Sequence, residues 1–350
     1  MTIGSVRKSV WTAVGIGVLL VAGLFAPEPV RGQYFGRNKV QYESFDFKTL
    51  ETPNYRILYY PESQAVIVDA GRMAERWYDR FSTLFQHELK ENQPIILYAN
   101  HADFQQTNVI SGLIGEGTGG VTEGLQNRVV MPLTGIYNEN NHVLGHELVH
   151  AFQYSIIKES SGGLSAARGM PLWFVEGMAE YLSLGREYPL TAMWMRDAVL
   201  HEDVPSISDM TRNPSYFPYR FGHAFWAWLT GQYTDDIVSR LMYGTVAGGY
   251  ELALQEILST SVDSLSLKWQ QAMHETYYPM ITDRAKPSEV GQPALNDGEA
   301  RMTLSPSISP DGRHAAFIAR RDIFTLNLYL ADLETGKIVQ IGRASCRERV

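Results

Sequence analysis

The segment His146-Glu147-Leu148-Val149-His150 carries the strongest chemical signal in the chain. On a helix, residues four apart differ by only about 40° around the axis, so the two imidazoles point the same way. Two neutral imidazoles one turn apart can hold one zinc ion at about 2.0–2.1 Å. Glu147 is turned aside from them and can face a zinc-activated water as a general base. The motif therefore predicts one Zn²⁺ bound by His146 and His150, with Glu147 as a catalytic residue.

The neighbours of this motif make a mostly buried helix, because they are largely apolar: Val143, Leu144, Leu148, Val149, Phe152 and Ile156. Burying two histidines and a glutamate without a purpose is costly. The alternative is a core helix whose polar groups are satisfied by hydrogen bonds alone. His142 extends the stripe, but it lies about 12 Å from His150 along the axis, so all three cannot bind one ion. We expect His142 at the rim of the site.

A catalytic zinc site needs a third protein ligand. The metzincin continuation is excluded, because Gln153 and Ile156 stand where it needs Gly and His. Further on, the segment L-W-F-V-E-G-M-A-E-Y at 172–181 places Glu176 and Glu180 four apart on one face of an apolar helix. Either of these two glutamates can supply the third ligand.

The pair H-E-L-V-H and W-F-V-E-G-M-A-E-Y resembles the gluzincins, in particular the peptidase MA-like family with thermolysin-like and aminopeptidase-N-like cores. The resemblance implies that Glu176, from E-G-x-A, is the third zinc ligand. It also implies that Glu180 lies behind a ligand histidine and orients it. Two departures from the pattern are the Glu at 180, where thermolysin-like members carry Asp, and the 25 residues between His150 and Glu176.

The same resemblance implies a substrate cleft before the zinc helix, where related gluzincins pair an edge strand with an extended peptide. Gly120, Val121 and Glu123 occupy this place, and Glu123 is the candidate counterpart of a substrate-amine-binding glutamate. The alternative is a glycine-rich turn before a strand. Related enzymes also place a Tyr or His beyond the third ligand as an oxyanion donor. Tyr219 and His223 are the candidates, with Tyr219 preferred, and aromatic packing is the alternative for both.

The elements that position these residues follow from the spacing of apolar side chains. Strands are expected at 55–60, 94–99 and 128–133, with N-E-N-N at 138–141 capping the zinc helix. Strands followed by helices indicate an α+β domain over 33–284, which the resemblance makes a thermolysin/aminopeptidase-like zincin. Helices are expected over 66–89, from the cap to about 157, over 171–185, and near 187–201, 216–232, 235–243, 248–259 and 262–280. Arg220 is expected to bind a substrate carboxylate or to pair with an acidic neighbour.

The C-terminal part differs in composition. Residues 285–300 form a polar linker, and 301–342 carry short strands with D-G and T-G turns. The motifs S-P-D-G-R and D-L-E-T-G resemble part of one blade of a TolB-like β-propeller. Because one blade cannot bury its own faces, we expect the front part of a longer protein. Residues 343–350 break the pattern and are expected to be non-native, so Cys346 carries no argument.

The N-terminus has a basic start followed by an apolar run over 10–26, which is typical of a secretory signal over 1–32. The alternative is an uncleaved anchor, since the run of about 17 residues is at the lower limit of a bilayer span. The formal charge is −8, and such an acidic chain argues against nucleic acid or anionic lipid as a partner. We expect a periplasmic or extracellular protein with no membrane segment beyond the signal.

Together these observations predict an exported zinc metallopeptidase that hydrolyses peptide bonds of a peptide or protein substrate. One alternative is a non-catalytic exported binding or assembly protein of the cell envelope that retains a peptidase fold and contacts an envelope partner through the propeller. Another is a zinc hydrolase of non-peptide amides. The intact His-Glu-His set argues against the binding protein, because binding alone has no need of Glu147.

Overall fold

The computed structural model describes residues 38–291, 293–295, 298, 300, 302–321 and 325–343. The predicted export signal lies outside the described residues, and so does the predicted non-native tail apart from Arg343. The chain is an α+β protein that divides into two compact units, one up to Tyr277 and one from Tyr278. This division falls inside helix α11 (Val262–Ile281), slightly before the predicted end of the first domain at 284.

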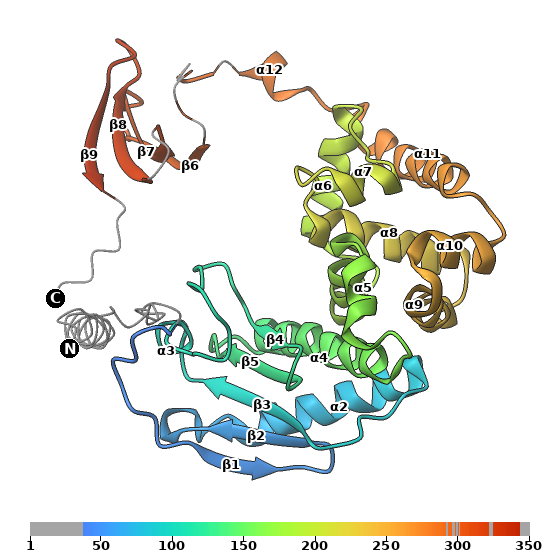
Figure 1. The fold of residues 1–350 in the computed structure, drawn as a ribbon. Helices are drawn as coiled ribbons and strands as arrows, with labels where there is room; N and C mark the ends of the chain where they lie inside the picture. The colour runs from blue at the N-terminus through green and yellow to red at the C-terminus, as the bar shows by residue number, and fades with distance from the viewer. Residues whose placement is uncertain are drawn as a thin grey trace, which may run out of the picture. The chain divides into compact units, whose positions relative to one another are not determined.

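The first unit contains a mixed sheet with the strand order β1-β2-β3-β5-β4 (Figure 1). Its inner strands β2, β3 and β5 run parallel, and β1 and β4 pair antiparallel at the two edges. The three predicted strands are confirmed, and β1 was missed because its side chains are mostly exposed and show no buried face. The strands are β1 (Lys48–Glu51), β2 (Tyr55–Tyr59), β3 (Gln93–Tyr98), β4 (Val121–Glu123) and β5 (Arg128–Pro132).

Helices α2 (Ile67–Phe85) and α4 (Tyr137–Glu159) lie along one face of this sheet (Figure 1). They approach closely at Gly145, where a Cβ atom would lie 2.6 Å from the Trp77 ring. The rings of Phe81 and Phe152 meet between them at 5.9 Å. The motif helix α4 is thereby anchored in the core of the first unit.

The expectation that residues 138–141 cap the motif helix was wrong. Helix α4 begins at Tyr137, and its N-cap residue Ile136 makes no capping bond through its side chain. Asn140 lies within the first turns of the helix, and its Oδ1 accepts a hydrogen bond from the backbone N of Thr134 instead. A run of cap-forming residue types marks the region of a helix start but not its first residue.

Helices α5 to α11 complete the first unit, and each predicted helix is present with ends shifted by a few residues. The short α3 and α7 were not predicted. Helices α5 and α8 cross with their backbones in contact, since a Cβ on Gly177 would lie 2.4 Å from the carbonyl carbon of Gly222. The helices other than α2, α4 and α11 are α3 (His101–Phe104), α5 (Leu172–Leu184), α6 (Pro189–Leu200), α7 (Ile207–Arg212), α8 (Pro218–Gln232), α9 (Asp236–Gly248) and α10 (Tyr250–Leu258).

The second unit contains an antiparallel sheet with the order β6-β7-β8-β9, preceded by a short helix α12 (Pro287–Val290) within the predicted linker. The predicted turns are present, with Gly312 and Gly336 at φ +72° and +70°. Among the described residues no helix is long and apolar enough to cross a bilayer. The strands are β6 (Met302–Ile308), β7 (His314–Arg320), β8 (Asn327–Asp332) and β9 (Ile338–Arg343).

Candidate metal centre

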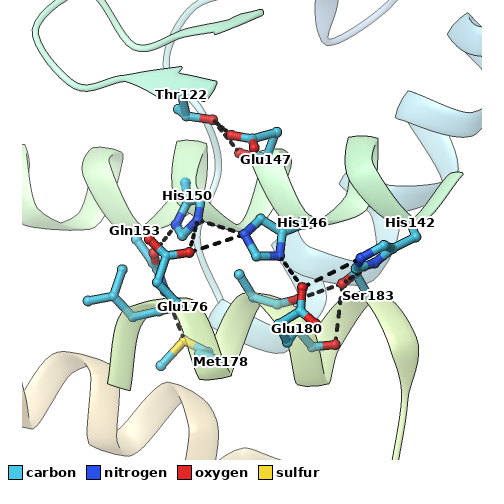
Figure 2. A network of polar contacts seen from close by, with 12 residues as sticks. Thr122, His142, His146, Glu147, His150, Gln153, Glu176, Met178, Glu180 and Ser183 are labelled. Atoms are coloured by element: carbon cyan, nitrogen blue, oxygen red, sulfur yellow. Dashed lines mark hydrogen bonds and ion pairs between the residues drawn. The ribbon is translucent and has the colours of Figure 1, made fainter. Parts of the chain in front are cut away.

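Three side chains of metal-binding types converge on one point between α4 and α5. The Nε2 atoms of His146 and His150 lie 3.1 Å apart, and each lies 3.2 Å from Oε2 of Glu176. Figure 2 shows the two imidazoles of α4 facing Glu176 of α5. The two histidines are 7% and 8% exposed, so the cluster is shielded from solvent. The structure therefore brings together the three predicted ligands.

The size of this triangle fits a zinc ion. Ligand atoms at 2.0–2.1 Å from a tetrahedral zinc are separated from one another by about 3.3 Å. The observed separations of 3.1–3.2 Å are close to that value. A point at a zinc bond length from all three atoms lies about 1 Å out of their plane, which leaves a fourth direction open.

The protonation of the histidines also favours a cation at this point. Nδ1 of His150 donates to Oε1 of Gln153 at 2.8 Å, which leaves the lone pair of its Nε2 directed at the cluster. Nδ1 of His146 lies 3.1 Å from Oε1 of Glu180, although outside hydrogen-bond alignment. The Nε2 lone pair of His150 thus meets the carboxylate oxygen of Glu176, and the two repel one another unless positive charge lies between them.

The pKa values of His146 and Glu176 also indicate that the cluster favours a positive charge. Burial lowers the pKa of His146, but the neighbouring carboxylates of Glu176 and Glu180 outweigh it and raise this pKa to about 10. Burial opposes the charge of Glu176 as well, yet His150 and His146 hold its pKa well below the usual range. The surrounding carboxylates therefore favour a positive charge at the two imidazoles.

Glu147 lies on the side of α4 that faces β4, away from the two imidazoles (Figure 2). Thr122 Oγ1 lies 2.7 Å from Oε2 of Glu147 and 2.9 Å from its backbone oxygen, and its one hydroxyl proton can be donated to either. Gly120 closes the other side, because a Cβ there would lie 2.8 Å from Cγ of Glu147. The carboxylate is therefore held in a fitted space apart from the three predicted ligands. Thr122 was not predicted as a site residue. Its place in the middle of a short strand could have indicated that its side chain faces either the core or solvent.

Glu180 lies behind His146, as the resemblance implied. It is 3% exposed and is paired with Nη1 of Arg220 at 2.7 Å and with Nε2 of His142 at 3.5 Å. Burial raises the pKa of Glu180, but His146 and Arg220 outweigh it and lower this pKa. Of the two roles expected for Arg220, the structure shows the pairing with an acidic neighbour. His142 lies outside the cluster and contacts Ser183, as expected for a residue at the rim.

Gln153 is a site residue that the sequence analysis missed as such. Its Oε1 accepts a hydrogen bond from His150. Its Nε2 donates to the carbonyl oxygen of Val175 at 3.2 Å and contacts Sδ of Met178 at 3.4 Å. It therefore links the helix of the two histidines to the helix of Glu176. The signal that could have found it is its position three residues after His150, on the same face of the helix.

A cavity of about 440 Å³ opens at the cluster. The predicted cleft residues Gly120 and Val121 line it, together with the cluster, Glu147 and an apolar group formed by Ile157, Ala167, Met170, Leu172 and Val175. Glu123 is not among the lining residues. Its carboxylate accepts from the backbone N of Leu125 and Gln126 and pairs with Arg128 at 3.3 Å. Glu123 therefore closes the turn that follows β4, and the expected edge strand is present as β4 in place of the glycine-rich turn that was the alternative.

The two candidate oxyanion donors differ in position. Tyr219 lines the cavity, and its ring is stacked on His146 with centroids 5.8 Å apart. Burial and the nearby Glu176 raise its pKa, so its hydroxyl remains a hydrogen-bond donor at neutral pH. His223 is fully buried, and its two ring nitrogens contact Thr191 Oγ1 at 2.8 Å and the oxygen of Gly185 at 2.7 Å. The structure therefore does not bring His223 to the site, and packing describes it.

The comparisons with protein-family models and curated proteins identify no relative of this chain. No protein-family model matches the chain, and a search of curated proteins finds no match.

Proposed function

We propose that this chain is an exported zinc metallopeptidase of the gluzincin type that hydrolyses peptide bonds. The observation that carries the proposal is the separation of roles within one cavity. His146, His150 and Glu176 converge within 3.2 Å of one another, while Glu147 is held apart from them by Thr122 and still lines the same cavity. A site that served metal storage or stability alone has no need of this fourth, separately held carboxylate.

The proposed roles follow from the positions of the side chains. Zinc in this site would act as a Lewis acid on the scissile carbonyl and lower the pKa of a water toward about 7. Glu147 accepts a proton from the attacking water and passes it to the leaving amine. Tyr219 donates a hydrogen bond to the oxyanion. Glu180, paired with Arg220, orients His146, and Gln153 orients His150.

The finer assignments belong to the same proposal. The first unit would be a thermolysin/aminopeptidase-like zincin domain, and the sheet of the second unit part of a TolB-like β-propeller blade that contacts an envelope partner. The order of a small mixed sheet followed by helices supports the first assignment. The antiparallel four-stranded sheet with its two glycine turns supports the second.

The variant Glu147→Gln tests the proposal. Glutamine has the size of glutamate and keeps an oxygen that can accept from Thr122, so the fold and the predicted ligands are preserved. We expect cleavage of a mixed peptide library, followed by mass spectrometry, to fall by about 10²–10⁴-fold while one zinc per chain remains. Glu139→Gln, at an exposed position of the same helix, is the control and should cleave normally.

Two outcomes would contradict the proposal. Unchanged cleavage by Glu147→Gln would remove the proposed base. A zinc-loaded wild-type chain that cleaves no peptide would favour the non-catalytic binding protein, or a hydrolase of non-peptide amides.

A further inference from the structure

A row of aromatic rings leads from the cavity to the surface of the first unit. Tyr219 lines the cavity, and the ring of Phe217 stacks on it with centroids 5.1 Å apart. Trp194 of α6 packs on Phe217 at 5.6 Å and meets the buried ring of Phe221 edge-on at 6.0 Å. Because Phe221 is buried, Trp194 is held in place on its inner side.

This row is exposed to an extent that the packing of the unit does not require. Phe217 is 41% exposed and Trp194 is 37% exposed. Leu190 lies one turn before Trp194 on the same face of α6 and is 47% exposed. Contiguous apolar surface of this kind marks a binding site more often than scattered single residues do. Because this surface is connected to the cavity through Tyr219, we infer that the molecule that binds in the cavity also covers it.

We propose that Phe217 and Trp194 form an aromatic track that binds apolar or aromatic side chains of the polypeptide substrate next to the scissile bond. The inference rests on the proposed function, since a polypeptide bound in the cavity at Tyr219 can extend over Phe217, whose ring stacks on Tyr219. Aromatic side chains on the substrate can stack against the two rings, which already occupy fixed positions and lose little freedom on binding. The track therefore selects apolar substrates and leaves the metal ligands unaffected.

The test uses two variants of the full chain that keep the fold. Phe217 is the N-cap residue of α8, so Phe217→Ser places a preferred cap type there. Trp194→Gln places a good helix former on the exposed face of α6. Tyr243→Gln is the matched control, because Tyr243 is 40% exposed on α9 and is not part of the aromatic row. Zinc content and thermal midpoint are measured for all three variants.

The substrates are the peptide that the wild type cleaves best in a mixed library and derivatives with single serine replacements of its apolar residues near the scissile bond. For the wild type we expect at least one replacement to lower kcat/KM by about tenfold, equivalent to about 1.4 kcal/mol. The two track variants should cleave the parent peptide about tenfold more slowly and the serine derivative at the wild-type rate. Tyr243→Gln should behave as the wild type.

The outcomes separate this inference from the proposed function. If the track variants slow all peptides by one common factor, or if no apolar residue of the substrate matters, the aromatic track is refuted while the peptidase stands. If the wild type cleaves no peptide at all, the proposed function fails, and the track fails with it.

Discussion

Gly120→Ala tests the proposed general base Glu147 separately from the proposed metal ligands. The added Cβ would lie 2.8 Å from Cγ and 2.9 Å from Oε1 of Glu147. Carbon atoms in contact prefer separations of about 3.5–4.0 Å, so the Glu147 side chain must withdraw by about 0.7 Å or more. Since the clash involves a side chain and no backbone atom is among the nearest contacts, the fold can survive the change.

The loss of activity follows from this displacement. The bond between Thr122 and Glu147, 2.7 Å long, must lengthen or turn as the carboxylate moves. A misplacement of about 1 Å in a reacting group can cost about 100-fold in rate, or about 2.7 kcal/mol of transition-state stabilisation. His146, His150 and Glu176 are not among the atoms that the new methyl group would meet first. We therefore expect kcat to fall by about 10- to 100-fold at full zinc occupancy.

The assay is the kcat and KM of the best-cleaved peptide, with zinc content and thermal midpoint measured on the same sample. Gly119→Ala is the control, because its Cβ would lie 3.2 Å from a methyl group of Val143 and would not meet Glu147 first. It should retain kcat within about threefold. Unchanged kcat for Gly120→Ala would refute the role of Glu147 in this position. Loss of zinc would show that the two parts of the site are not separable.

Three further changes test other parts of the structure. Glu176→Ala should lower zinc occupancy far more than Glu180→Ala, because Glu180 only orients a proposed ligand, a contact worth about 10–100-fold in zinc affinity. If metal analysis gave the reverse order, the roles of the two glutamates would be exchanged. Gly177→Ala must push α5 and α8 apart and should cost about 1–3 kcal/mol in urea unfolding, and an unchanged midpoint would contradict the backbone contact. Burial lowers the pKa of His223, so its contribution to stability is present above the unfolded pKa of about 6.5 and is lost as the pH falls below it. His223→Gln should therefore be less stable than the wild type at pH 8 but lose less stability between pH 8 and pH 5; a steeper loss would refute this reasoning.

The predicted geometry that the structure reproduces depends on spacing within one helix. The shared direction of His146 and His150, and the separate direction of Glu147, follow from the helical period wherever the helix lies. The meeting of α4 with α5 does not follow from any local pattern. Glu176 was identified through a resemblance, and the structure brings it to the two histidines through packing between distant segments.

The parts that were missed depend on long-range contacts. Thr122 acts on Glu147 through the contact of β4 with α4, 25 positions away in the chain. His223 was a reasonable candidate by residue type, but it lies a turn beyond Tyr219 and points to Gly185. Glu123 does not have its expected role, because its carboxylate is bound by the backbone N–H groups of the following turn and by Arg128. Residue type alone could not distinguish these cases.

The contact between Gly177 and Gly222 limits how this site can open. No side chains separate the two backbones there, so the helices cannot slide past each other on a layer of repacking rotamers. Glu176 and Glu180 lie on α5, and Tyr219 and Arg220 lie on α8, so this close backbone contact fixes the spacing between the two pairs. For the proposed peptidase we therefore expect a bulky substrate to enter along the opposite wall, where the short edge strand β4, preceded by glycines, lines the cavity.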